Sequence, residues 1–121
     1  MSNKKVLVVD DSATDRHVLA AMLEKNGYEV FTAESGIEAL DKADRFRPDV
    51  ILMDVVMPGT SGFQVTRTIS KNETTKHIPI IICSSKGQET DKIWGLRQGA
   101  REYLVKPIAE SDLLQKIAAL T

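Results

Sequence analysis

A run of four apolar residues ends on a carboxylate at positions 50–54, Val-Ile-Leu-Met-Asp, and a Pro-Gly turn follows at residues 58 and 59. A continuous apolar run of this length, bounded by turn signals, is typical of a strand that is buried on both faces. Parallel sheets with helices on both faces contain such strands. Asp54 would then end its strand at the edge where open α/β sheets bind ligands.

Strand-like and helix-like segments alternate five times along the chain. The first strand is a fully apolar stretch at residues 6–9, extended to Lys4, and the fourth is the apolar stretch before Ser84. This alternation predicts an α/β fold, a doubly wound parallel sheet of five strands with five helices. The expected strands are residues 4–9, 28–33, 50–54, 80–83 and 102–105.

Helix starts are marked by two candidate capping boxes, Ser12 with Asp15 and Ser35 with Glu38. Asn26-Gly27 is a typical end for the first helix. Shorter helices are expected near residues 63–70 and 88–98, followed by a last helix at the carboxyl terminus. The helical residues expected to face the core are Val18, Leu19, Met22, Leu23, Ile37, Leu40, Ala43, Leu113, Leu114, Ile117 and Ala118.

The length of 121 residues fits one domain, so we expect residues 1–121 to form it without an output domain. The formal net charge of −1 argues against a dominant electrostatic attraction to nucleic acid. No stretch looks like a signal peptide or is long enough to cross a membrane, so we expect a cytoplasmic protein. Cys83 is the single cysteine; it excludes an intrachain disulfide and is expected to be a small buried hydrophobe.

Polar residues follow four of the expected strands. Asp10 and Asp11 end the first, Asp54 the third and Lys106 the fifth, and Ser84 begins the loop after the fourth. Because parallel strands end at one edge of a sheet, these residues can converge. Clustered carboxylates repel one another unless a cation joins them or some of them bind protons.

This set of groups suits a phosphoryl group carried on a carboxylate. Carboxylates and a backbone carbonyl are ligands that Mg²⁺ accepts, and a lysine ammonium suits a phosphate oxygen. A carboxylate can also be the nucleophile that forms an aspartyl phosphate. An isolated Asp-Asp pair is more often a polar turn with a helix cap, and an isolated Lys-Pro is weaker evidence still. The combination at one sheet edge is what favours function.

Several motifs together resemble the response-regulator receiver family, the CheY-like proteins. They are Val-Val-Asp-Asp-Ser at 8–12, Leu-Met-Asp-Val-Val-Met-Pro-Gly at 52–59 with Gly62, Cys-Ser-Ser at 83–85, and Tyr-Leu-Val-Lys-Pro at 103–107. The resemblance extends over essentially the whole chain. It implies a flavodoxin-like sheet with the strand order 2-1-3-4-5.

The resemblance assigns roles to the matching residues. Asp54 would accept the phosphoryl group from the phosphohistidine of a partner histidine kinase. Asp11 and Asp54 would ligate Mg²⁺ together with the backbone carbonyl of Val56, and Asp10 would act nearby through water. Lys106 would pair with the phosphoryl oxygens.

The resemblance also implies a conformational switch. Ser84 would bond to the phosphoryl group and move toward it, and Tyr103 would turn into the vacated space. The Lys106–Pro107 bond would be cis, a form that only X-Pro bonds adopt readily. Val56 stands where other members carry polar residues, so an altered phosphoryl lifetime is expected; Lys86, two residues after Ser84, is expected to influence access.

The segment 88–104 is similar to the stand-alone regulators of the type IV pilus chemosensory pathway, which implies a role in twitching motility. Trp94 lies in this segment. Its first interpretation is a partly buried packing residue, and its second is part of an output face with Tyr103. The partners implied are a histidine kinase and a downstream motility or signalling protein, with no nucleic acid and no membrane insertion. We expect a monomer, and a phosphorylation-dependent dimer is left open.

The leading hypothesis is a phosphorylation-switched module that acts by binding partners or as a phosphate sink. It would not be an enzyme, apart from its own phosphotransfer and dephosphorylation. A pseudo-receiver that acts without phosphorylation is the first alternative. A Mg²⁺-dependent phosphatase of the haloacid dehalogenase class is another, although that class carries its nucleophile on the first strand. A flavodoxin-like cofactor binder is the last, and Asp10-Asp11-Ser12 would repel its phosphate.

Overall fold

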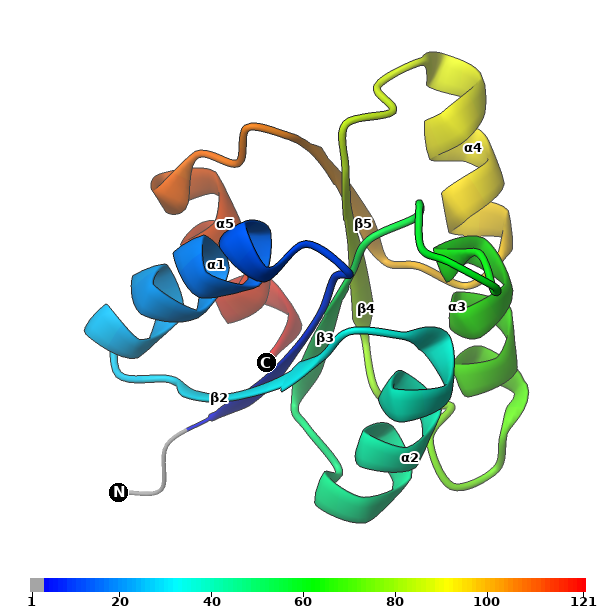
Figure 1. The fold of residues 1–121 in the computed structure, drawn as a ribbon, viewed down its shortest axis with the longest axis horizontal. Helices are drawn as coiled ribbons and strands as arrows, with labels where there is room; N and C mark the ends of the chain where they lie inside the picture. Colours follow the sequence, from blue (N-terminus) through cyan, green and yellow to red (C-terminus); the bar gives the residue numbers. More distant parts are fainter. Residues whose placement is uncertain (1–3) are drawn as a thin grey trace.

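The computed structural model describes residues 4–121 as five strands and five helices in strict alternation. The sheet lies in the middle, with α1 and α5 on one face and α2, α3 and α4 on the other (Figure 1). The elements are β1 (Lys5–Val9), α1 (Ala13–Lys25), β2 (Glu29–Ala33), α2 (Gly36–Phe46), β3 (Val50–Met53), α3 (Gly62–Lys71), β4 (Ile80–Ser84), α4 (Glu89–Arg97), β5 (Glu102–Val105) and α5 (Glu110–Leu120).

All neighbouring strands are parallel, and their order is β2-β1-β3-β4-β5. The predicted fold class and strand order are therefore confirmed. The chain places β2 on one side of β1 and β3 on the other, so the winding direction reverses at β1 and β3. This reversal opens a crevice at the carboxyl ends of these strands, and open α/β sheets bind ligands there.

Alternate residues of the central strands pack into two cores. Val6 and Val8 of β1 lie in a cluster with Leu19 of α1 and Leu113 of α5. Leu7 belongs to the opposite cluster, which contains residues from α2 and α3. Because both faces of each central strand are covered, the apolar run need not alternate with polar residues, which explains the pattern at residues 50–53.

Three residues expected in the core are exposed instead. Ile37 is 81 % exposed, and Val18 and Ala118 also lie on the surface. On α2 the buried strip consists of Gly36, Ala39 and Ala43, and Ile37 lies beside this strip. The spacing of apolar residues therefore identified the helices correctly. It predicted buried faces that are too wide, because each included one residue that lies beside the true buried face.

The two predicted capping boxes are each half formed. Ser12 and Ser35 accept hydrogen bonds from the backbone N–H groups of Asp15 and Glu38, so both serines cap their helices. The acidic side chains bind elsewhere: Asp15 contacts Lys106, and Glu38 pairs with a lysine one turn along α2. The serine caps alone therefore fix where α1 and α2 begin.

Gly62 brings the start of α3 against the end of β3. Its N–H donates to the carbonyl of Val55 at 2.8 Å. A Cβ atom at this position would lie 1.9 Å from the backbone oxygen of Asp54, which is far inside contact distance. Only glycine therefore allows the loop after Asp54 to fold back this closely.

Among the described helices, none combines the length and apolar character needed to cross a bilayer.

We expect Gly62→Ala to destabilise the protein by about 3 kcal/mol, because backbone must move away from the new methyl group. Gly59→Ala is the matched control in the same loop. Gly59 has a φ of +85° but nothing within 4 Å of its Cβ position, so its cost is about 1 kcal/mol of backbone strain. Urea unfolding measures both, and equal losses would contradict the proposed close approach.

Candidate functional site

Backbone hydrogen bonds align the strand ends that carry the polar residues. The N–H of Asp54 donates to the carbonyl of Val9 at 2.9 Å, which joins the ends of β3 and β1. The N–H of Lys106 donates to the carbonyl of Ser84 at 2.8 Å, which joins the ends of β5 and β4. The parallel register therefore sets the relative heights of these residues along the sheet edge.

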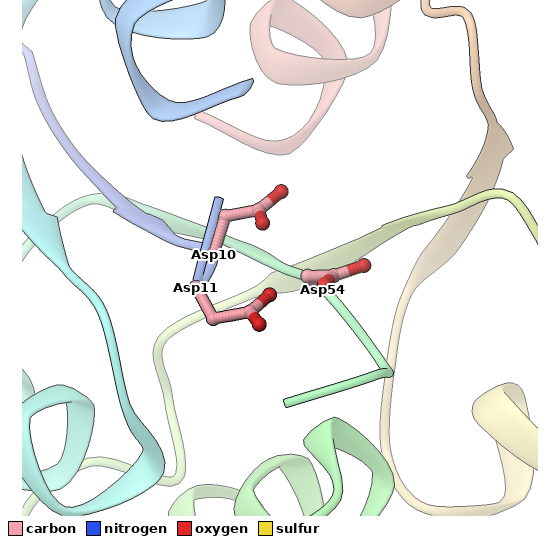
Figure 2. A group of neighbouring side chains, drawn as sticks. All are labelled: Asp10, Asp11 and Asp54. Carbon is pink, nitrogen blue, oxygen red and sulfur yellow. The ribbon is translucent and has the colours of Figure 1, made fainter. Parts of the chain in front are cut away.

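Three carboxylates meet at this edge. Asp10, Asp11 and Asp54 each offer a carboxylate oxygen, and these oxygens lie within 4.8 Å of one another. Figure 2 shows the side chains close together, the first two from the end of β1 and the third from the end of β3. Asp10 and Asp54 are buried, and Asp11 is exposed. The cluster therefore has a buried floor and one side open to solvent.

The ammonium of Lys106 lies among the carboxylates. Its Nζ is 2.8 Å from Asp10 Oδ2, 2.9 Å from Asp15 Oδ2 and 3.6 Å from Asp54 Oδ1. Burial by itself would lower the pKa of Lys106, but the hydrogen bonds to Asp10 and Asp15 and the charge of Asp54 outweigh it and hold that pKa above its ordinary value. Lys106 is therefore a permanent positive charge in the site.

Asp54 is 7 % exposed and lies beside like charges. Burial, followed by the negative charge of Asp10, raises the pKa of Asp54 to about 6, although Lys106 opposes the shift. The site thus contains more negative charge than one ammonium balances. A divalent cation in the cluster would remove this penalty, because an opposite charge favours the ionised carboxylate.

Asp10 is held on both of its carboxylate oxygens. Oδ1 accepts from the backbone N–H of Ser12 at 2.9 Å, and Oδ2 accepts from Lys106. The Asp10 carbonyl also accepts from Arg16 Nη1 at 2.7 Å. Because its oxygens are already engaged, Asp10 suits an indirect role near a cation, whereas Asp11 and Asp54 present the more available oxygens.

The backbone of Lys86 joins Ser84 and Tyr103. Ser84 is fully buried and is the last residue of β4, rather than the first residue of the following loop as predicted. Its Oγ accepts from the N–H of Lys86 at 3.1 Å. The Tyr103 hydroxyl donates to the carbonyl of Lys86 at 2.6 Å. One peptide segment therefore contacts both residues expected to form the switch.

Comparison with known proteins decides the family. Residues 6–118 match the response regulator receiver domain. Protein PilH of Pseudomonas aeruginosa is 53 % identical over 116 residues, which cover 96 % of both chains. The chain belongs to the response-regulator receiver family. Several other relatives are longer than this receiver, which spans between 26 % and 52 % of their length.

Solved structures agree with this assignment. The receiver is similar to the chemotaxis protein CheY4 of Vibrio cholerae, with a TM-score of 0.92, 37 % identity, and coverage of 99 % of this chain and 100 % of the other. It is also similar to the receiver domain of a sensor histidine kinase from Pseudomonas aeruginosa, with a TM-score of 0.90, 32 % identity and 98 % coverage of both chains. That structure has a magnesium ion coordinated in the active-site cleft.

The receiver brings together the residues that its sequence singles out at the sheet edge. Lys106 joins the aspartate cluster directly, and Ser84 ends the neighbouring strand. The Lys106–Pro107 bond is cis, as expected. Val56 lies two residues beyond Asp54 with an exposed side chain. Cys83 is buried, and burial raises the pKa of its thiol to about 12, which agrees with a packing role.

Trp94 of this receiver lies on α4 and is 50 % exposed, which is compatible with its first interpretation as a partly buried residue. Ile93 and Leu96 on the same helix are exposed as well. Tyr103 lies beside α4, because a Cβ on Gly95 would come within 3.0 Å of its ring. The second interpretation, an output face formed by Trp94 with Tyr103, stays a prediction.

Asp15 is a site residue that was not predicted from the sequence. Its pattern with Ser12 predicted only a helix cap, whereas the receiver places its carboxylate 2.9 Å from Lys106 Nζ. The two residues are 91 positions apart. The available signal was the position of Asp15, one helical turn beyond Asp11, because a helix starting at the sheet edge points its first turn toward the site.

Asp54 makes receiver stability depend on pH in buffer with a metal chelator. Its pKa is about 6 when folded against 3.8 ordinarily, so the folded state binds more protons between these values and stability falls as pH rises through them. We expect Asp54→Asn to be more stable than wild type by about 1–2 kcal/mol at pH 8, after allowing for solvent screening. Urea unfolding from pH 4 to 8 measures this advantage, which should shrink toward pH 4; a pH-independent difference would contradict it.

Proposed function

We propose that this receiver is a stand-alone response regulator that accepts a phosphoryl group on Asp54 from a histidine kinase and thereby changes its affinity for a partner. The observation that carries the proposal is the convergence of Asp10, Asp11, Asp54 and Lys106 at one sheet edge. A local charge change at such a site can bias a two-state element and so alter binding elsewhere.

Asp54 supplies the nucleophile in this proposal. One of its carboxylate oxygens would form a bond to phosphorus while the phosphorus–nitrogen bond of the donor phosphohistidine breaks, and the released imidazole takes a proton from solvent. Such transfers depend mainly on positioning and charge neutralisation. Lys106, with its Nζ 3.6 Å from Asp54 Oδ1, is close enough to neutralise a phosphoryl oxygen.

The donor set fits Mg²⁺. This cation favours oxygen ligands and retains several waters, so one or two carboxylates are sufficient. Asp11 and Asp54 would bind it together with the backbone carbonyl of Val56, and Asp10 would act through water. When bound, Mg²⁺ would offset the negative charge of the transferring phosphoryl group. The magnesium in the similar kinase receiver domain supports this assignment.

The switch would run through the segment after β4. The Ser84 hydroxyl would bond to the phosphoryl group, which would draw it away from the N–H of Lys86. The Lys86 carbonyl also accepts a hydrogen bond from the Tyr103 hydroxyl. A shift of this segment would therefore change the hydrogen bond that holds Tyr103. Tyr103 lies against α4, whose exposed residues include Trp94, so the change would reach the surface there.

Similarity to PilH supports a place in a type IV pilus chemosensory pathway and twitching motility. The partners would be the histidine kinase of that pathway and a downstream motility protein, or the receiver would act as a phosphate sink. Its own phosphotransfer and dephosphorylation would be its sole catalysis. In this role the receiver would act in the cytoplasm.

Phosphorylation is tested by intact mass after incubation with acetyl phosphate. We expect one phosphoryl adduct on the wild type with Mg²⁺, and almost none when a chelator removes the metal, because the carboxylate cluster would then repel the anionic donor. Asp54→Ala should carry no adduct. Asp41→Ala is the control, because Asp41 is an exposed carboxylate paired with Arg45 on α2, and it should be modified like the wild type.

Rapid loss of the phosphoryl group could hide the adduct, so beryllofluoride binding is measured in parallel by calorimetry. A wild type that neither forms the adduct nor binds beryllofluoride would refute the proposal and favour a receiver that acts without phosphorylation.

The pathway is tested in cells. We expect expression of this receiver in a Pseudomonas aeruginosa strain that lacks PilH to shift the diameter of the twitching zone toward wild type, because the two proteins are 53 % identical. The Asp54→Ala variant at equal expression should not. Equal effects of the two forms would argue against a phosphorylation-dependent role, and no effect of either would argue against this pathway.

A further inference from the structure

The contacts of Lys106 are unequal on its two sides. On the side that faces the amino end of α1, two carboxylates bind its ammonium closely. They are Asp10 at 2.8 Å and Asp15 at 2.9 Å. The proposed phosphoacceptor Asp54 lies farther away, at 3.6 Å. An ammonium that must pair with a phosphoryl group on Asp54 is therefore held toward α1 while that group is absent.

Asp15 makes this contact instead of completing the cap of α1. In a full capping box its carboxylate would accept from the backbone N–H of Ser12. That N–H donates to Asp10 Oδ1 instead, and the Asp15 side chain turns to Lys106. The serine hydroxyl alone caps the helix, so the carboxylate of Asp15 is available to bind Lys106 in the site.

We propose that Asp15 is a positioning residue that holds Lys106 on the α1 side of the site until a phosphoryl group on Asp54 draws it across. This inference rests on the proposed function of Asp54. Asp15 differs from Asp10 in exposure: its side chain is 44 % exposed and that of Asp10 is 2 % exposed. Solvent weakens an exposed ion pair, so breaking the contact with Asp15 costs less free energy than breaking the contact with Asp10.

The consequence is a brake on phosphorylation. To pair with the arriving phosphoryl group, Lys106 must leave Asp15, so the lost contact adds to the barrier. Removing the charge of Asp15 should therefore speed the reaction. The free energy of an exposed ion pair corresponds to about a threefold to fivefold change in rate.

The first experiment measures the rate of phosphorylation by acetyl phosphate with Mg²⁺, followed by intact mass. In this reaction an oxygen of Asp54 bonds to phosphorus while the bond from phosphorus to the acetate oxygen breaks, and acetate leaves. Asp15→Asn keeps the size of the side chain, and we expect it to react about threefold to fivefold faster than wild type. Glu24→Gln, an exposed carboxylate of α1, is the control and should not change the rate.

A double-mutant cycle separates an effect through Lys106 from an effect of charge alone. If Asp15 acts by holding the lysine, Asp15→Asn should leave the slower rate of Lys106→Met unchanged within twofold. If Asp15 merely repels the anionic donor, the Asp15→Asn substitution should accelerate the Lys106→Met variant by the same factor as it accelerates the wild type. The second result would overturn the proposal, as would an Asp15→Asn rate equal to or below that of wild type.

A second readout does not depend on phosphorylation. Limiting acetic anhydride acetylates accessible amines, and peptide mass spectrometry gives the rate at Lys106. We expect Asp15→Asn to raise this rate and Glu24→Gln to leave it unchanged, because only the first removes one of the two carboxylates that bind the ammonium closely. A wild type without any phosphoryl adduct would refute the proposed function, whereas unchanged labelling of Lys106 in Asp15→Asn would refute the positioning role.

Discussion

The backbone hydrogen bonds at the carboxyl edge of the sheet, from Asp54 to Val9 and from Lys106 to Ser84, set the spacing on which the whole site depends. They bring the ends of four strands level, so that side chains from distant parts of the sequence meet. A slip of one residue in either pair would turn the side chains to the opposite face of the sheet. Close packing in the two apolar cores opposes such a slip, because every strand side chain would have to fit a different set of neighbours.

Charge is the second constraint, and it follows from the first. Four carboxylates, those of Asp10, Asp11, Asp15 and Asp54, surround or adjoin one ammonium. Burial and the charge of Asp10 raise the pKa of Asp54, and the unfavourable negative charge favours whatever brings positive charge to it. The same imbalance that costs stability in the isolated protein therefore makes the site receptive to a divalent cation.

In the proposed switch, the backbone of Lys86 would link the site to a distant surface. Its N–H and its carbonyl bind Ser84 and Tyr103, respectively. Ser84 is fully buried at the end of β4, whereas Tyr103 lies against α4 on the way to the surface. A backbone segment with a partner at each end can transmit movement without any rearrangement of the cores, which fits the proposed switch.

The sequence by itself determined the fold class, the elements and most of the site, because apolar runs, serine caps and polar strand ends are local signals. Asp10, Asp11, Asp54, Ser84 and Lys106 could be found from it, since parallel strands must end at one edge. Only the tertiary structure decided that Ile37 lies outside the core and that Asp15 contacts Lys106 rather than its own helix end. Both outcomes depend on how a helix is rotated about its axis against the sheet, and that rotation is set by packing between distant residues, which no local pattern encodes.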